Sequence, residues 1–295
     1  MRIFVITKRN LLISAAVLAA FIACAIALAF SCGGGHAVEN KPEKTGAAEP
    51  AREAASAAQT APRTGLLSSE DIYEADVLAG LHKELPVYSV ERSDGKIALT
   101  IDAAWDDDKT PFILETLSKY NVKATFFLCG SWVTAYPDQV LAIHRAGHSI
   151  GNHSMTHPHM SELTEERIKK EISDLDDALQ SITGERSTLF RAPFGEYNDR
   201  VILAVRASGH EPIQWDIDTI DWKPERSSQT ILDSVLPKLH DGAVILCHNN
   251  GYKIEEYLPT LIETAQANGY SFVTVDELLL GGETMIDVNG VQKLK

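Results

Sequence analysis

Short apolar runs of strand length alternate with helical patterns over the C-terminal two-thirds of the chain. The runs, in chain order, are "IALTI", "ATFFLC", "HSIGN", "TLFRA", "EPIQW", "AVILC" and "SFVTV". Each has the length and the apolar character of a buried strand, and helical spacing fills the segments between them. This alternation predicts a parallel sheet covered by helices.

The clearest helical pattern extends from Leu163 to Thr183. Its apolar positions recur at spacings of four and three residues, and they are Ile168, Ile172, Leu175, Leu179 and Ile182. Gly184 stands where a helix commonly ends. Two α/β architectures fit such a chain, a compact β/α barrel and an open doubly wound sheet. No glycine-rich phosphate loop follows the first strand, which disfavours the nucleotide-binding form of the open sheet.

The N-terminus has the pattern of a membrane-targeting segment. Arg2, Lys8 and Arg9 precede an uncharged apolar stretch from Leu11 to Cys32. At ~1.5 Å per residue this stretch is long enough to cross a ~30 Å hydrocarbon layer, with the basic end inside. We predict a retained single-pass signal anchor over residues 1–32 and a head outside the cytoplasmic membrane. A cleaved signal, which gives a secreted protein, and a lipoprotein with lipidated Cys32 remain open alternatives.

Composition divides the remainder into segments. Residues 33–65 are rich in Ala, Glu and Pro and have almost no large apolar side chain, so we predict a disordered linker. Residues 66–95 form an N-terminal extension with weak helical spacing, followed by a short hairpin or edge element at "PVYSVERSDG". Residues 96–281 form the main domain, and residues 282–295 form a C-terminal tail.

The charge balance excludes one class of partner. The chain has 41 acidic and 27 basic residues, a formal net charge of −14, so binding to nucleic acid through phosphate contacts is not expected. Four cysteines are too few for a disulfide scaffold. A bridge between Cys129 and Cys247 is the less favoured alternative to two buried thiols.

Polar residues capable of chemistry follow the predicted strands. Asp102 follows "IALTI", His153 follows "SIGN", Arg191 follows "TLF", Asp218 and Asp221 follow "PIQW", and His248 follows "VILC". Ligand sites of barrels and open α/β sheets lie at the carboxyl ends of their strands. Chance placement of polar residues explains one or two such positions but poorly explains all five strand ends, so we predict one shared site.

Two of these stretches indicate a metal site. His153 and His157 are four residues apart, so both imidazoles can face one cation, with His159 as an additional candidate. Imidazole ligands favour zinc, and cobalt, nickel, manganese and iron fit the same donors. The alternative is that these histidines bind no metal and are simply exposed or hydrogen-bonded.

The remaining stretches indicate acid–base chemistry. Arg191 can orient a carboxylate and keep it ionised, and a backbone N–H in the turn at "RAPFG" can face an oxyanion. The alternative for this stretch is an ordinary structural turn. An Asp beside His248 would raise the basicity of its imidazole, which suits a general acid.

The order of these motifs resembles that of the polysaccharide deacetylase family, the NodB-homology or carbohydrate esterase 4 group. The resemblance covers Lys96 to Leu280 and rests on the stretches "TIDAAWD", "HSMTH", "RAPFG", "DTIDW" and "LCH". It implies a distorted (β/α) barrel that removes acetyl groups from N-acetylated sugars with the help of a divalent metal. It therefore implies a hydrolase acting on non-peptide carbon–nitrogen bonds, and with the predicted anchor it suggests cell-wall peptidoglycan as the glycan partner.

The resemblance also implies a role for each matched residue. Asp102 is the catalytic base, His153 and His157 are metal ligands, and Arg191 supports the carboxylates of the site. The backbone of Phe194 faces the oxyanion, while Trp222 and Leu246 line the acetyl pocket. Asp221 tunes His248, which protonates the leaving amine.

One position departs from the family pattern. The first motif usually reads Asp-Asp, the second aspartate being a metal ligand, and here that position is Ala103. The motif resembles a subgroup of bacterial cell-wall and sporulation deacetylases that vary this position. Asp102, Asp106 or Asp107 is then a candidate third ligand, although the run of aspartates from Asp106 to Asp108 also suits a solvated loop and helix cap.

Three functions therefore remain in competition. The first is a membrane-anchored N-deacetylase, and the second is an impaired homologue that acts as a cell-wall glycan-binding or regulatory protein. The third is an amide hydrolase that acts on another small acylated molecule. Trp105, Trp132 and Trp222 are candidates for stacking on sugar rings, with core packing as the alternative.

Overall fold

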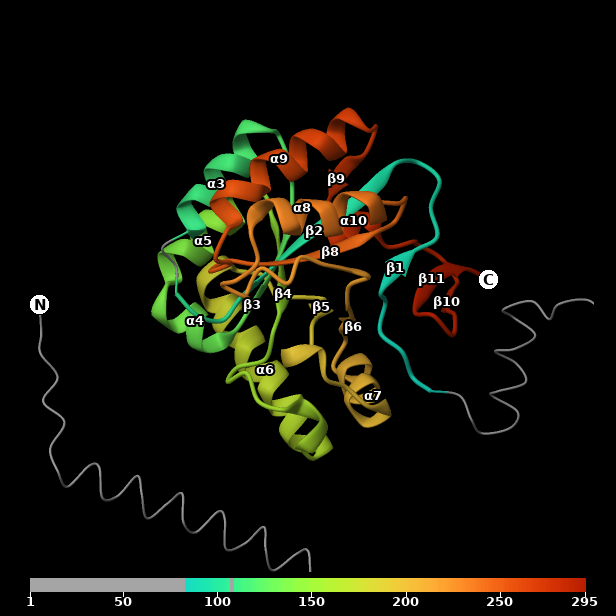
Figure 1. The fold of residues 1–295 in the computed structure, drawn as a ribbon. Coiled ribbons are helices and arrows are strands. Elements are labelled where there is room, and N and C mark those ends of the chain that lie inside the picture. Colours follow the sequence, from blue (N-terminus) through green and yellow to red (C-terminus); the bar gives the residue numbers. More distant parts are fainter. Residues whose placement is uncertain (1–82, 107–108) are drawn as a thin grey trace, which may run out of the picture. The chain divides into compact units, whose positions relative to one another are not determined.

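The computed structural model describes residues 83–106 and 109–295 (Figure 1). The predicted anchor at 1–32, the predicted linker at 33–65 and most of the predicted extension at 66–95 lie outside this part of the chain. Within the described ranges, no helix has the length and apolar content needed to span a bilayer.

A parallel sheet of eight strands forms the centre of the domain. Its path runs β6-β5-β4-β3-β2-β8-β7, and β9 pairs with β2 beside that path. The strands are β2 (Lys96–Ala103), β3 (Thr125–Leu128), β4 (Ser149–Asn152), β5 (Leu189–Phe190), β6 (Glu211–Pro212), β7 (Ile217–Asp218), β8 (Val244–His248) and β9 (Ser271–Val273). No pairing among these strands joins β6 to β7. The sheet is thus a half barrel, which agrees with the predicted distorted (β/α) barrel, and all seven predicted strands are present.

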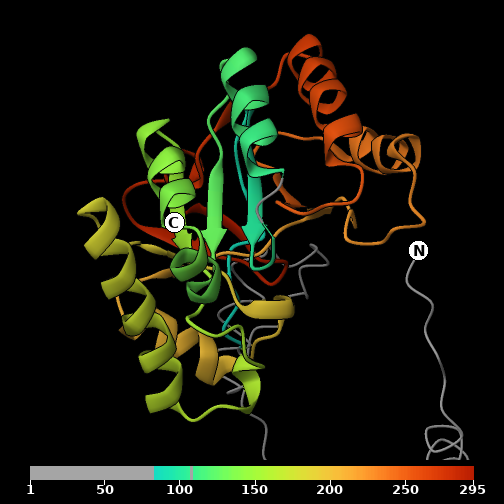
Figure 2. The same ribbon diagram turned by 90° about the vertical axis from the view of Figure 1, so that its left-hand side faces the viewer.

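Helices surround this sheet (Figures 1 and 2). They are α3 (Thr110–Lys119), α4 (Gly130–Ala135), α5 (Pro137–Arg145), α6 (Glu165–Thr183), α7 (Asp199–Ala207), α8 (Ser228–Val235), α9 (Ile254–Ala267) and α10 (Val275–Leu278). Short 3-10 turns are η1 (Met160–Glu162), η2 (Pro193–Gly195) and η3 (Leu236–Lys238). In Figure 1, α3, α4 and α5 lie to the left of the strands, α8, α9 and α10 lie above them, and α6 and α7 lie below.

Helix α6 shows why the sequence pattern located it so well. Thr164 caps its start by accepting a hydrogen bond from the Arg167 N–H, and Gly184 ends it in the left-handed conformation with φ 83°. The predicted apolar positions Ile168, Ile172 and Leu175 are buried. The predicted helix therefore differs from the observed one only at its first two residues.

A second, three-stranded sheet has the order β1-β11-β10, with β1 (Ser89–Val90), β10 (Thr284–Ile286) and β11 (Val291–Leu294). Strand β1 is the edge element anticipated after Pro86, and it pairs in parallel with β11. Residues 282–295, which the pattern assigns to a tail, thus contain two strands. Hairpin β10-β11 is antiparallel and depends on Gly290, whose φ is 79° and whose Cβ, if present, would lie 2.3 Å from the Tyr88 ring.

The side chains of β2 point alternately to the two faces of the sheet, and this places Asp102 in the site. Ile97, Leu99, Ile101 and Ala103 belong to the core cluster between sheet and helices, as expected because alternate side chains of a strand point to opposite faces. Asp102 points to the other face, where Arg191 lies. Cys129 and Cys247 are buried free thiols, which matches the favoured alternative.

Candidate active site

Five parallel strands bring the predicted residues to one edge of the sheet. A cavity of about 470 Å³ lies there. The predicted residues that line it are Asp102, His153, His157, Phe194, Trp222, Leu246 and His248. Arg191 and Asp221 do not line the cavity; both are fully buried behind it. The structure therefore brings all nine predicted site residues together.

Asp102 is held by a buried guanidinium. Arg191 Nη1 donates to Asp102 Oδ1 at 2.7 Å and to the Thr100 hydroxyl at 2.8 Å. Arg191 Nη2 donates to the Gln214 carbonyl at 2.9 Å. Burial disfavours the charged carboxylate, but the positive charge of Arg191, the electrostatic contributions of His153 and His248, and the hydrogen bond from Arg191 outweigh it and lower the pKa of Asp102. Asp102 is thus ionised at neutral pH, as a base must be.

His153 is oriented by the backbone. Its Nδ1 donates to the Arg191 carbonyl at 2.8 Å, so Nε2 keeps a free lone pair and lies 3.7 Å from Asp102 Oδ2. Burial lowers the pKa of His153 and outweighs the opposing effect of Asp102. Neutral imidazole with one nitrogen fixed by a carbonyl is the form that binds metals.

His157 lies beside His153, with ring centroids 4.9 Å apart. Its backbone has φ 56°, an uncommon conformation for a side chain of this size, and its N–H donates to the Ser154 hydroxyl at 3.0 Å. Its Nδ1 is buried and has no hydrogen-bond partner. Burial, followed by repulsion from His153, lowers the pKa of His157 to about 4. Both imidazoles are therefore neutral donors.

The donor set fits a divalent ion only in part. Two neutral imidazoles suit such an ion, but catalytic zinc sites commonly have three protein ligands. Within the described ranges, no group of three or more His, Cys, Asp or Glu side chains is arranged to hold a metal. Ala103 lies buried in the helix-side core and is not part of the cavity lining, whereas Ala104 is.

The other candidate ligands are also accounted for. Asp106 is exposed, Asp107 and Asp108 lie outside the described residues, and His159 Nδ1 pairs with Glu196 Oε2 at 2.8 Å. Asp102 Oδ2 lies 3.7 Å from His153 Nε2 and lines the same cavity as both imidazoles, so it is the remaining candidate carboxylate ligand.

His248 has an acidic partner, as predicted. Its Nδ1 donates to Asp221 Oδ1 at 2.7 Å, and its backbone N–H donates to Asp221 Oδ2 at 3.1 Å. Burial lowers the pKa of His248, but the hydrogen bond and charge of Asp221, with the charges of Asp102 and Asp218, outweigh burial and raise it. His248 therefore stays protonated to higher pH than an ordinary histidine, which suits a proton donor.

Two supporting residues were not anticipated from the sequence. The Tyr257 hydroxyl on α9 donates to Asp221 Oδ2 at 2.6 Å. The Gln214 side chain donates to the Gly195 carbonyl at 2.8 Å and so supports the turn that contains Phe194. Each residue contacts a partner that is distant in sequence, so no short sequence motif indicated its role.

The turn at Phe194 leaves a donor free. Phe194 has φ 60°, and no described group accepts a hydrogen bond from its backbone N–H. This conformation costs roughly 1 kcal/mol or more in a non-glycine residue. A strained turn with an unused N–H beside a cavity is suited to binding an oxyanion.

Known proteins are similar to this chain in sequence and in fold. The family model described as polysaccharide deacetylase matches residues 89–213. A peptidoglycan-N-acetylglucosamine deacetylase of Bacillus cereus is 32% identical over 195 residues, which cover 65% of this chain and 70% of the relative.

Two solved structures are also similar. BA3943, a CE4 family pseudoenzyme from Bacillus anthracis, is 33% identical with a TM-score of 0.63, and the match covers 68% of this chain and 70% of that one. A mutant of BA3943 with restored enzymatic activity is 34% identical, with a TM-score of 0.63 and coverage of 68% and 72%.

A family 4 acetyl xylan esterase from Clostridium thermocellum, solved with a cobalt ion, is 30% identical with a TM-score of 0.58 and coverage of 62% and 89%. Enzymes of this family thus use a divalent metal. The predicted resemblance is confirmed: this chain belongs to the polysaccharide deacetylase family, whose peptidoglycan deacetylases are hydrolases acting on carbon–nitrogen bonds.

Proposed function

We propose that this protein removes acetyl groups from N-acetylhexosamine units of a glycan of the peptidoglycan type. The observation that carries the proposal is the pairing of Asp102 with His248 across β2 and β8. Each has its own buried partner, Arg191 for Asp102 and Asp221 for His248. A protein that only binds glycan has no evident need for both a stabilised base and a stabilised acid.

Each residue has a defined step in amide hydrolysis. Asp102 takes a proton from a water molecule while the oxygen of that water bonds to the acetyl carbon. The Phe194 N–H then donates a hydrogen bond to the oxyanion that forms on the former carbonyl oxygen. His248 then protonates the sugar nitrogen while the carbon–nitrogen bond breaks, giving acetate and a free amine. Trp222 and Leu246 line the cavity where the acetyl methyl would lie. A divalent ion on His153 and His157 would polarise the acetyl carbonyl and lower the pKa of the attacking water.

Acetate release from chitotetraose and from purified peptidoglycan tests this function. We expect the full chain to release acetate when a divalent metal is supplied, and His248→Ala to lower the rate by at least about 100-fold. Leu203→Ala, on the exposed side of α7, is the control and should leave the rate unchanged. Absence of acetate with zinc, cobalt, nickel, manganese or iron would contradict the proposal.

A second candidate is a glycan-binding homologue without activity. Ala103 favours it, because the protein ligand set is incomplete, and so does the similarity to the pseudoenzyme BA3943. Glycan binding that persists in His248→Ala, together with no acetate release by the unchanged chain, would establish this alternative.

We also propose that residues 1–32 anchor the protein in the cytoplasmic membrane with the domain outside. The support is the basic flank and the apolar stretch from Leu11 to Cys32. Protease added to intact spheroplasts should digest the domain. Protection of the domain until the cells are lysed would refute this topology.

A further inference from the structure

We infer that Trp105 provides a stacking surface for a pyranose ring at the rim of the cavity, in a subsite separate from the acetyl position. This inference rests on the proposed function, and it specifies how the glycan is held. The relevant observations are the anchoring of the loop that contains Trp105, the exposure of its indole, and the aromatic rings opposite.

The loop after β2 is held in place from two sides. The Asp106 carbonyl accepts hydrogen bonds from Trp132 Nε1 and from Asn249 Nδ2, both at 2.6 Å. Asp106 has φ 54°, so the chain turns sharply directly after Trp105. Before the loop, the Ala103 carbonyl accepts from the Cys129 N–H at 2.9 Å. The backbone on both sides of Trp105 is thus fixed by neighbouring elements.

The indole itself remains in solvent despite this anchoring. Trp105 is 56% exposed, whereas Trp132, which ties the same loop, is 1% exposed. Core packing therefore accounts for Trp132 but not for Trp105. The Trp105 ring stands at 65° to His157, with centroids 4.8 Å apart. An anchored, exposed indole beside a reactive site is a feature of ligand-binding surfaces.

Other exposed aromatic rings line the same cavity. Phe194 follows β5 and Trp222 follows β7, and each is 54% exposed. Rings from three separate loops therefore border one cavity. A pyranose has an apolar face of C–H groups and a polar periphery, so it can cover such a ring while its hydroxyls stay hydrated. An oligosaccharide of N-acetylglucosamine is the occupant that fits these rings and the acid–base pair together.

Binding and turnover, measured separately, test the role of Trp105. Dissociation constants for chitotetraose would be measured by calorimetry with the full chain bearing His248→Ala, which prevents turnover. In this background we expect Trp105→Ala to weaken binding about tenfold or more. Trp105→Phe keeps a flat ring and should recover most of the affinity, and Leu203→Ala should have no effect. Circular dichroism would verify that each variant is folded.

Steady-state kinetics of the otherwise unchanged chain supply a second measurement. Trp105→Ala should raise KM for chitotetraose with a smaller change in kcat, because the stacking contact is made before and during the reaction. For N-acetylglucosamine monomer, which fills only the acetyl position, the same substitution should change kcat/KM by less than about twofold.

The outcomes distinguish this inference from the proposed function. Affinity of Trp105→Ala within about twofold of its parent would overturn the subsite alone. Tight, Trp105-dependent binding without acetate release would overturn the hydrolase and leave the subsite in place. Failure of the parent to bind chitotetraose would overturn both the subsite and the proposed substrate class.

Discussion

The paired charges at the ends of β2 and β8 decide the chemistry at the scale of single residues. Asp102 has a lowered pKa and His248 has a raised pKa, each because of a buried partner of opposite charge. The base is thus deprotonated and the acid protonated over the same range of pH. Activity should fall at acidic pH as Asp102 gains a proton and at alkaline pH as His248 loses one.

Replacing Asp221 should move only the alkaline limb. Asp221→Asn removes the negative charge that raises the pKa of His248, so His248 loses its proton at lower pH and the alkaline limb of kcat/KM shifts to lower pH. The pH profile of acetate release measures this. Asp138→Asn, at an exposed position of α5, is the matched control. An unshifted alkaline limb in Asp221→Asn would show that His248 is not the acid.

Introducing a carboxylate next to Asp102, at Ala103, should make the stability of the domain depend on zinc. Ala103 is fully buried among apolar side chains, so Ala103→Asp without metal should lower the free energy of unfolding by about 1–3 kcal/mol. If the new carboxylate reaches the two imidazoles, zinc at about 100 times its Kd restores about 2.7 kcal/mol. Acetate release should increase in the same variant.

Urea unfolding with zinc and with a chelator measures this linkage. Ala104→Asp is the comparison, because Ala104 lines the cavity and Ala103 does not. Equal destabilisation of Ala103→Asp with and without zinc would mean that its carboxylate points into the helix-side core.

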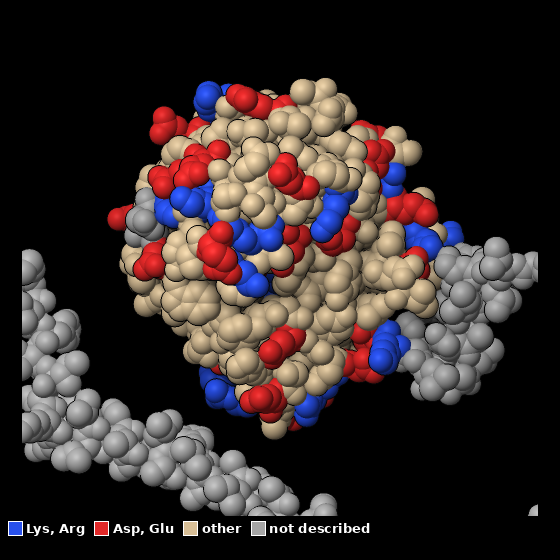
Figure 3. All heavy atoms as spheres, viewed as in Figure 1, with Lys and Arg blue, Asp and Glu red and all other residues tan. Residues whose placement is uncertain are grey.

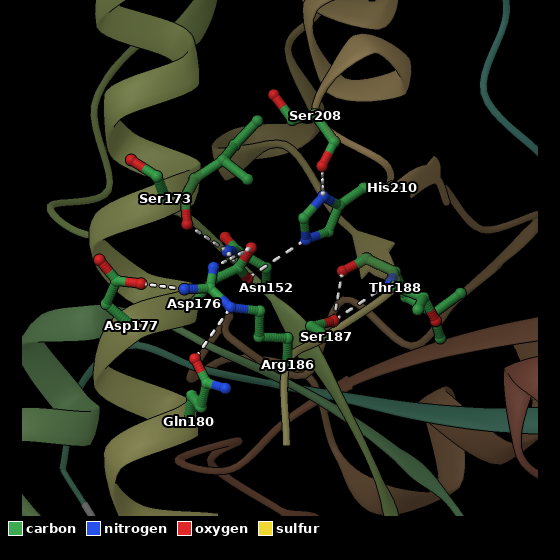
Figure 4. A network of polar contacts seen from close by, with 12 residues as sticks. Asn152, Ser173, Asp176, Asp177, Gln180, Arg186, Ser187, Thr188, Ser208 and His210 are labelled. Carbon is green, nitrogen blue, oxygen red and sulfur yellow. Dashed lines mark hydrogen bonds and ion pairs between the residues drawn. The ribbon is translucent and has the colours of Figure 1, made fainter. Parts of the chain in front are cut away.

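At the scale of elements, α6 supports strand β4, which ends at Asn152 directly before His153. Asn152 Nδ2 donates to Asp176 Oδ1 and to the Ile172 carbonyl, both at 2.9 Å, and His210 Nε2 lies 3.2 Å from the same Asp176 oxygen (Figure 4). Asp176 is 5% exposed, so these partners have little access to water. The contacts connect α6, the end of β4 and the residue before β6.

Loss of the Asp176 carboxylate should therefore destabilise the domain. Asp176→Ala leaves Asn152 and His210 without their shared acceptor, and we expect a loss of about 1–3 kcal/mol in the free energy of unfolding. Asp174→Ala on the same helix removes only an exposed ion pair with Lys170, which is worth about 0.5 kcal/mol or less. Chemical denaturation compares the two. Equal losses in both variants would show that the buried contacts add nothing.

At the scale of the whole molecule, the small sheet connects the two ends of the domain. The Glu91 N–H donates to the Gln292 carbonyl at 2.8 Å, and the Leu280 N–H donates to Gln292 Oε1 at 2.8 Å. Charged side chains of both signs are interspersed on the face of the domain in Figure 3. Hydrogen bonds between segments distant in sequence thus hold this end of the domain together.

Removal of the last strands should lower the thermal stability. A chain ending at Leu280 lacks β10 and β11 and leaves β1 without a partner, so we expect Tm to fall by more than about 5 °C. Calorimetry measures this, with the exposed substitution Val288→Ser as the control. An unchanged Tm would mean that the small sheet contributes no stability to the domain.

The sequence by itself determined the parallel architecture, helix α6 and the placement of Asp102, Arg191 and His248 at strand ends. These follow from local regularities, since apolar periodicity sets strand and helix and parallel strands present their carboxyl ends at one edge. The predicted roles of Phe194, Trp222 and Leu246 came instead from the resemblance to the family. The stop residue Gly184 made the end of α6 readable for the same reason, whereas the predicted start lay two residues before the observed one.

Only the tertiary structure decided which groups support that site. Tyr257, Gln214 and Asp176 contact their partners across long separations in sequence, and no short-range pattern encodes such contacts. It also placed Ala103 in the helix-side core and Trp105 in solvent, although both lie in one short motif. Side-chain exposure there depends on the packing of α4, β8 and the loop after β2, which forms only when the whole chain has folded.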